Sequence, residues 1–67
     1  MKFAERLKEL RLAKGLTQLE LAKILRVDKT TVTYWENGTN ETNFETLMKI
    51  AKFFEETTDY LLGMTDY

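Results

Sequence analysis

The sequence predicts an all-α fold in which five short helices form one compact domain over residues 1–67. Apolar residues recur at helical spacing in separate stretches, and residues that favour helix N-caps precede these stretches. Proline is absent, and the three glycines stand where helices would end. A chain of this size has room for one core, from which we expect about 3–5 kcal/mol of stability.

The composition excludes most kinds of catalytic and metal site. There is no cysteine and no histidine, and therefore no zinc site, disulfide, thiolate nucleophile or histidine general base. No glycine-rich phosphate loop is present either. We therefore expect no enzyme activity, no cofactor, no metal and no small-molecule ligand. The apolar runs are too short for a signal peptide or a membrane span, so we expect a soluble, cytoplasmic protein.

The net charge of −1 hides an asymmetry along the chain. Residues 1–30 contain eight basic and four acidic residues, whereas residues 31–67 contain two basic and seven acidic ones. A basic half joined to an acidic half indicates that one face of the molecule meets an anion.

The first two predicted helices are separated by a short loop that contains Gly15. The first covers about residues 2–14, and its apolar stripe consists of Phe3, Leu7 and Leu10. Thr17 and Glu20 have the spacing of a capping box, so the second helix begins there and runs to about residue 25.

The stretch 30–35 allows two interpretations. Its β-branched and aromatic residues favour a strand, and the Asn-Gly pair that follows could form a hairpin turn. A hairpin needs a second β-prone run, however, and residues 39–43 are polar loop formers. We therefore predict a third helix over residues 28–37, with Asp28 as its N-cap. Because so few residues separate it from the second helix, the two form a helix-turn-helix at about residues 17–37.

Two further helices complete the predicted fold. Asn43 and Thr57 are the expected N-caps of the fourth and fifth helices, and Gly63 ends the fifth. The expected core stripe of the fourth helix consists of Phe44, Leu47, Ile50, Ala51 and Phe54.

The predicted third helix has an inner and an outer side. Val32 and Trp35 fall on the inner side and are expected in the core. The outer side is polar and would fit the major groove of DNA, where such side chains can contact base edges. The expected base contacts are Asp28, Lys29, Thr30, Thr33 and Tyr34.

Phosphate contacts are expected mainly where helices begin and end. The start of the second helix combines unpaired backbone amides with side-chain donors, an arrangement that holds a phosphate. The expected phosphate contacts are Thr17, Gln18, Arg26, Asn37, Gly38, Thr39 and Asn40.

The same residues resemble those of a known family. The motif segments are Gln18-Leu19-Glu20-Leu21-Ala22, Val27, Val32 and Tyr34-Trp35-Glu36-Asn37-Gly38. They resemble the phage-repressor helix-turn-helix family, also called the Cro or xenobiotic-response-element type. The flanks at residues 3–7, 14–18 and 59–63 are similar as well, so the resemblance covers nearly the whole chain.

The resemblance implies a lambda-repressor-like fold and a transcriptional regulator, with repression as the expected mode. Members of this family bind double-stranded operator DNA as dimers. The resemblance also implies a largely buried ion pair between Arg11 and Glu36, joining the first helix to the third.

Two departures from the family pattern affect the interpretation. Arg26 stands where the family usually has glycine, so it either adopts a positive φ at a cost of about 1–2 kcal/mol or contacts a phosphate. Residues 39–41 replace basic residues that are common there, which should lower DNA affinity and its salt dependence. With the acidic net charge, this leaves an alternative function: a protein-interaction module with the same fold and weak or no DNA binding.

Surface residues suggest where partners would bind. Tyr60, Met64 and Tyr67 leave an apolar C-terminal surface that could join two copies of the chain. Arg6 and Lys8 are expected to be exposed to solvent rather than bound to DNA. Three further apolar residues lie off the core stripes and are expected to be exposed, with a surface for another protein as the alternative: Leu12, Leu19 and Ile24.

Overall fold

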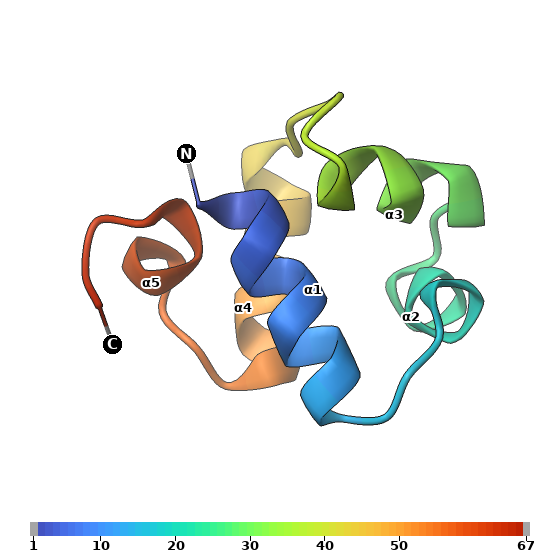
Figure 1. Ribbon diagram of the computed structural model, residues 1–67, viewed down its shortest axis with the longest axis horizontal. Coiled ribbons are helices and arrows are strands. Elements are labelled where there is room, and N and C mark those ends of the chain that lie inside the picture. The colour runs from blue at the N-terminus through green and yellow to red at the C-terminus, as the bar shows by residue number, and fades with distance from the viewer. Residues whose placement is uncertain (1, 67) are drawn as a thin grey trace.

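The structure is a computed structural model that describes residues 2–66, and five α-helices make up its regular structure (Figure 1). In chain order they are α1 (Phe3–Ala13), α2 (Gln18–Leu25), α3 (Lys29–Glu36), α4 (Phe44–Phe54) and α5 (Thr58–Leu62). In Figure 1, α1 runs through the middle, with α2 and α3 on one side, α5 on the other and α4 behind. The all-α prediction is confirmed, and the strand interpretation of residues 30–35 is wrong.

Side-chain caps begin three of the helices as predicted. Thr17 Oγ1 accepts the amide of Glu20 at 3.0 Å, and the Glu20 carboxylate accepts the amide of Thr17 at 2.8 Å, which completes the capping box. Asn43 and Thr57 cap α4 and α5 through equivalent bonds. Asp28 holds the N-cap position of α3, but its side chain makes no cap bond, so that part of the prediction is wrong. Its carboxylate is therefore left free at the start of α3.

Two helices end at residues other than glycine in the left-handed conformation. Arg26 has φ +60° after α2, and Glu55 has φ +56° after α4. The positive φ expected for Arg26 is confirmed. This geometry lets the Val27 amide donate to the Ala22 carbonyl at 2.9 Å, the long-range bond of a Schellman motif. The chain thereby turns from α2 into α3 within a few residues.

Apolar side chains from every helix form the core. Val32 and Trp35 point into it with 0% and 4% of their surfaces exposed, which confirms the predicted inner side of α3. The ring of Phe3 meets Trp35 edge-on, with centroids 6.4 Å apart. The buried apolar residues are Phe3, Leu7, Leu21, Ala22, Leu25, Val32, Trp35, Leu47, Ile50, Ala51, Phe54 and Leu61.

The predicted stripe of α4 is wrong at its first member, because Phe44 is 85% exposed. Helical periodicity tells which side of a helix faces the core, but not how far along the helix its neighbours reach. Phe44 is the first residue of α4, and it lies at the rim of the core.

Arg6, predicted to be exposed, is buried against the C-terminal part of the described chain. Its guanidinium carbon lies 4.2 Å from the centroid of the Tyr60 ring. The same group donates to the carbonyl oxygens of Tyr60 and Thr65 and lies 3.9 Å from the Asp66 carboxylate. The prediction is wrong because the acceptors come from residues more than fifty positions away in the sequence.

The apolar C-terminal surface predicted for a second copy is only partly free. Tyr60 is half-buried against Arg6, whereas Met64 is 73% exposed, and Tyr67 lies outside the described residues. The exposure expected for three other apolar residues is confirmed for Leu12, Leu19 and Ile24. Across residues 2–66, no helix has both the length and the apolar character needed to cross a bilayer.

Arg26 provides a test of the left-handed turn between α2 and α3. The free energy of unfolding of Arg26→Gly should be about 1 kcal/mol larger than that of Arg26→Ala, because alanine keeps the left-handed strain and glycine does not. The usual order within a helix is the reverse. Urea denaturation followed by circular dichroism measures the difference, with Lys23→Gly and Lys23→Ala inside α2 as the control pair. If the alanine variant is the more stable one at position 26 as well as at position 23, Arg26 is not strained.

Candidate nucleic-acid interface

A bidentate ion pair joins α1 to α3. Arg11 Nε donates to Glu36 Oε2 at 2.7 Å and Arg11 Nη2 to Glu36 Oε1 at 2.9 Å. Both side chains are almost fully covered, with 8% and 3% of their surfaces exposed. Arg11 Nη1 donates to the Leu16 carbonyl at 2.8 Å, so the loop before α2 is tied to the same guanidinium. The hydrogen bonds to Glu36 raise the pKa of Arg11, which keeps it charged.

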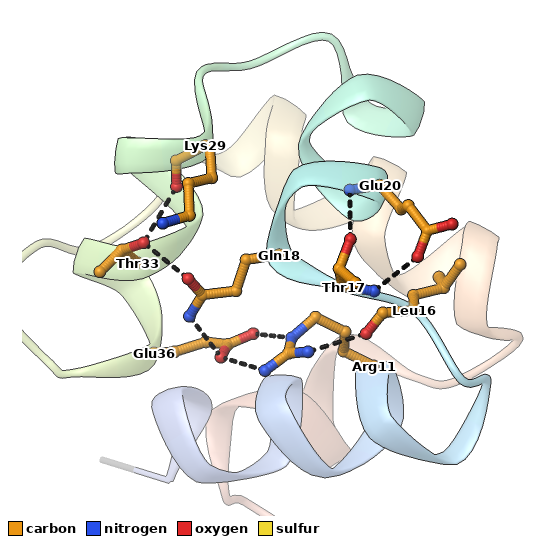
Figure 2. A network of polar contacts seen from close by, with 8 residues as sticks. All are labelled: Arg11, Leu16, Thr17, Gln18, Glu20, Lys29, Thr33 and Glu36. Atoms are coloured by element: carbon orange, nitrogen blue, oxygen red, sulfur yellow. Dashed lines mark hydrogen bonds and ion pairs between the residues drawn. The ribbon is translucent and has the colours of Figure 1, made fainter.

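Gln18 extends this ion pair to the outer side of α3 (Figure 2). Its Nε2 donates to Glu36 Oε1 at 3.1 Å, and its Oε1 accepts from Thr33 Oγ1 at 2.8 Å. The first residue of α2 is therefore fixed against α3 by both ends of its amide. This role of Gln18 was not predicted, although Thr33 and Glu36 are three residues apart and so share one side of α3.

The network from Arg11 to Thr33 is fully satisfied. Within the described part of the chain, no buried side-chain nitrogen or oxygen lacks a hydrogen-bond partner. A satisfied buried network rigidifies the elements that it joins, whereas an unsatisfied one would destabilise them. The relative orientation of α2 and α3 is thus fixed by directional bonds as well as by packing.

The predicted base contacts lie together on one side of α3 and at its start. Asp28, Lys29, Thr30 and Tyr34 are exposed. Thr33 is half-buried, and its hydroxyl has both Gln18 Oε1 and the Lys29 carbonyl, at 3.2 Å, as acceptors. Because the hydroxyl has one proton, Thr33 offers an approaching ligand its methyl group and oxygen lone pairs rather than a free donor.

The start of α2 lies beside this group. The capping box uses the amides of Thr17 and Glu20, and the amides of Gln18 and Leu19 have no partner among residues 2–66. Such free amides carry the positive end of the helix dipole, which favours an anion.

The segment after α3 offers side chains rather than backbone amides. The amides of residues 37–40 all donate to carbonyl oxygens of α3, and the Asn37 side chain also accepts the amide of Thr39 at 2.9 Å. Gly38 has no donor besides its amide, which lies 3.3 Å from the Trp35 carbonyl. A phosphate at Gly38 would have to share that bond, whereas the side chains of Thr39 and Asn40 are exposed.

Arg26 is not brought together with the other expected phosphate contacts at the start of α2. It follows the last residue of α2, at the opposite end of that helix from Thr17 and Gln18. Its side chain lines a groove with Lys49 and Lys52 of α4.

This arrangement defines a class of protein. Two short helices joined by a tight turn, with the second presenting a polar side to solvent, form the helix-turn-helix of DNA-binding domains. The interface described above contains the free amides of the first helix and the exposed side chains of the second.

Comparisons with known proteins agree with this class. The chain belongs to the helix-turn-helix family, whose model matches residues 7–61. It is 47% identical over 63 residues to the HTH-type transcriptional activator BcrR of Enterococcus faecalis, covering 94% of this chain and 31% of the relative. It is 36% identical over 52 residues to the cryptic phage CTXphi transcriptional repressor RstR of Vibrio cholerae, covering 78% of this chain and 47% of the relative.

A solved structure has the same fold. The DNA-binding domain of the P22 c2 repressor superposes with a TM-score of 0.81 and 30% sequence identity, covering 90% of this chain and 79% of that one. The lambda-repressor-like expectation for the fold is thereby confirmed. The chain spans only about a third to a half of the length of the two regulators named above.

The ion pair between α1 and α3 should be essential for folding. Glu36→Ala leaves the Arg11 charge buried without its partner, which should lower the free energy of unfolding by about 3–5 kcal/mol. Arg11→Met combined with Glu36→Leu should lose much less, because no unpaired charge remains. Urea denaturation of the single and double variants measures both values, with Glu41→Ala at an exposed site as the control. A Glu36→Ala midpoint equal to that of Glu41→Ala would contradict the role of the pair.

The capping box of α2 should contribute to stability in a pH-dependent way. Hydrogen bonds from Thr17 hold the pKa of Glu20 below its ordinary value of 4.5. The contribution is therefore fully present above that ordinary value and is lost as the pH falls through the lowered pKa. Glu20→Gln keeps the cap geometry without a titrating charge, so its stability should fall less between neutral and acid pH. Thermal unfolding at a series of pH values compares it with the parent and with Glu45→Gln; identical acid profiles for all three would contradict the assignment.

Proposed function

We propose that this chain binds a specific sequence in double-stranded DNA and regulates transcription, with α3 in the major groove. The observation that carries the proposal is the network from Arg11 through Glu36 and Gln18 to Thr33. It fixes α3 so that Val32 and Trp35 face the core while the opposite side stays accessible.

The exposed groups at the start of α3 have chemistry that suits base edges. The Asp28 carboxylate, free of any cap bond, can accept from the amino group of cytosine. Lys29 can donate to guanine, and the methyl groups of Thr30 and Thr33 can contact thymine. Each good base contact contributes about 1–3 kcal/mol of discrimination. Tyr34, 41% exposed, completes the proposed reading surface.

Phosphate contacts would flank this surface on both sides. On one side they involve Thr17 and Gln18, and on the other the side chains of Asn37, Thr39 and Asn40. None of these residues is basic, so few counterions are released on binding. The affinity for DNA should accordingly depend only weakly on salt concentration.

The proposed binding unit is a homodimer, with one α3 in each half-site and half-sites about 34 Å apart. The exposed Met64, with Tyr60 and Tyr67, is the proposed contact between copies. The proposed location is the cytoplasm, where operator DNA is accessible. Repression is the proposed mode, and a promoter-reporter assay tests it against activation; the named relatives include an activator and a repressor.

Selection of binding sites from random duplex DNA tests this function. The parent should enrich paired half-sites, and Lys29→Ala should lose about 1–3 kcal/mol on the preferred site and relax one position in each half-site. Thr39→Ala should weaken binding to all sequences alike, because phosphate contacts do not read sequence. Lys8→Ala, at an exposed position of α1, is the matched lysine control and should change neither quantity.

The selection has clear contrary outcomes. If the parent enriches no DNA sequence, sequence-specific DNA binding is overturned and the alternative of an interaction module is favoured. A uniform loss for Lys29→Ala, with no change in preferred sequence, would show that α3 does not read bases.

A further inference from the structure

A surface groove of about 410 Å³ lies between the end of α2 and α4. Its apolar members are Ile24, Leu25 and Phe53. Its charged members are all cationic: Arg26, Lys49 and Lys52. We call these six residues the basic groove.

The charge of the basic groove is unusual for this chain. Residues 31–67 contain seven acidic and only two basic residues, and those two are Lys49 and Lys52. No acidic residue lines the groove. Within the described part of the chain, neither lysine forms an ion pair, and Arg26 forms none either. The groove is therefore lined by three cations and by no carboxylate, an arrangement that favours an incoming anion.

The apolar part of the groove restricts what that anion is. Ile24 is 45% exposed, and Phe53 is half-buried, with the Lys14 ammonium 5.1 Å from its ring centroid. A DNA phosphate needs cations but gains nothing from an exposed isoleucine. A protein segment that combines carboxylates with large apolar side chains fits both the cationic and the apolar residues of the groove.

We propose that the basic groove binds an acidic segment of a partner protein, with apolar side chains against Ile24 and Phe53 and carboxylates near Arg26, Lys49 and Lys52. The groove includes none of the proposed base-reading residues, and of the expected phosphate contacts it includes only Arg26, at the opposite end of α2 from Thr17 and Gln18. The inference goes beyond the proposed function and does not depend on it.

Selection from a displayed library of random peptides tests this proposal. The parent should enrich peptides that combine Asp or Glu with Leu, Phe or Trp. Fluorescence anisotropy with a synthetic copy of an enriched peptide should show at least about tenfold weaker binding to Lys49→Glu/Lys52→Glu. The matched control, Lys8→Glu/Lys23→Glu, changes the net charge equally at exposed positions outside the groove and should bind like the parent. Circular dichroism should show that both variants are folded.

Three results would overturn the proposal. Enriched peptides that lack acidic residues, or that bind both double variants equally, would remove the charge complementarity. A larger loss of DNA affinity in Lys49→Glu/Lys52→Glu than in the control would assign the lysines to phosphate contacts. Self-association of the parent that is lost only in Lys49→Glu/Lys52→Glu would make a second copy the occupant, which sedimentation velocity measures.

Discussion

The Glu36 carboxylate is the point at which α1, α2 and α3 meet. It accepts two hydrogen bonds from Arg11 and one from Gln18, at distances between 2.7 and 3.1 Å. Taking two charges out of water costs several kcal/mol, and their attraction offsets that cost only where the geometry is good and the remaining donors are bonded. The geometry here is bidentate, and the third guanidinium nitrogen of Arg11 donates to the Leu16 carbonyl. A small core alone would specify the angle between α2 and α3 less sharply.

Sequence reasoning succeeded where local chemistry decides the structure. The capping box at Thr17 and the caps at Asn43 and Thr57 follow from bonds within one helical turn. The inward direction of Trp35 follows from helical spacing, which also identifies the exposed side of α3. Because the candidate site lies on that exposed side, most of its residues could be predicted in the same way.

The remaining features depend on neighbours that are distant in the sequence. Gln18 was expected to face a phosphate, but its link to Thr33 depends on how α2 and α3 cross. Phe44 has the right spacing for the core, yet 85% of its surface is exposed at the start of α4. Asp28 is a good N-cap by type and holds the N-cap position of α3, but its side chain makes no cap bond. Local patterns do not encode any of these three outcomes.

The burial of Arg6 has a consequence for the cooperativity of the fold. Its guanidinium bridges α1 to the carbonyl oxygens of Tyr60 and Thr65, so the first and last helices share one set of bonds. Opening α5 would strip the acceptors from a covered cation and expose the underside of α1 at the same time. The amide protons of α1 and α5 should therefore exchange with solvent as a single unit. Truncation of the chain after Leu62 should also lower the protection of the α1 amides against exchange.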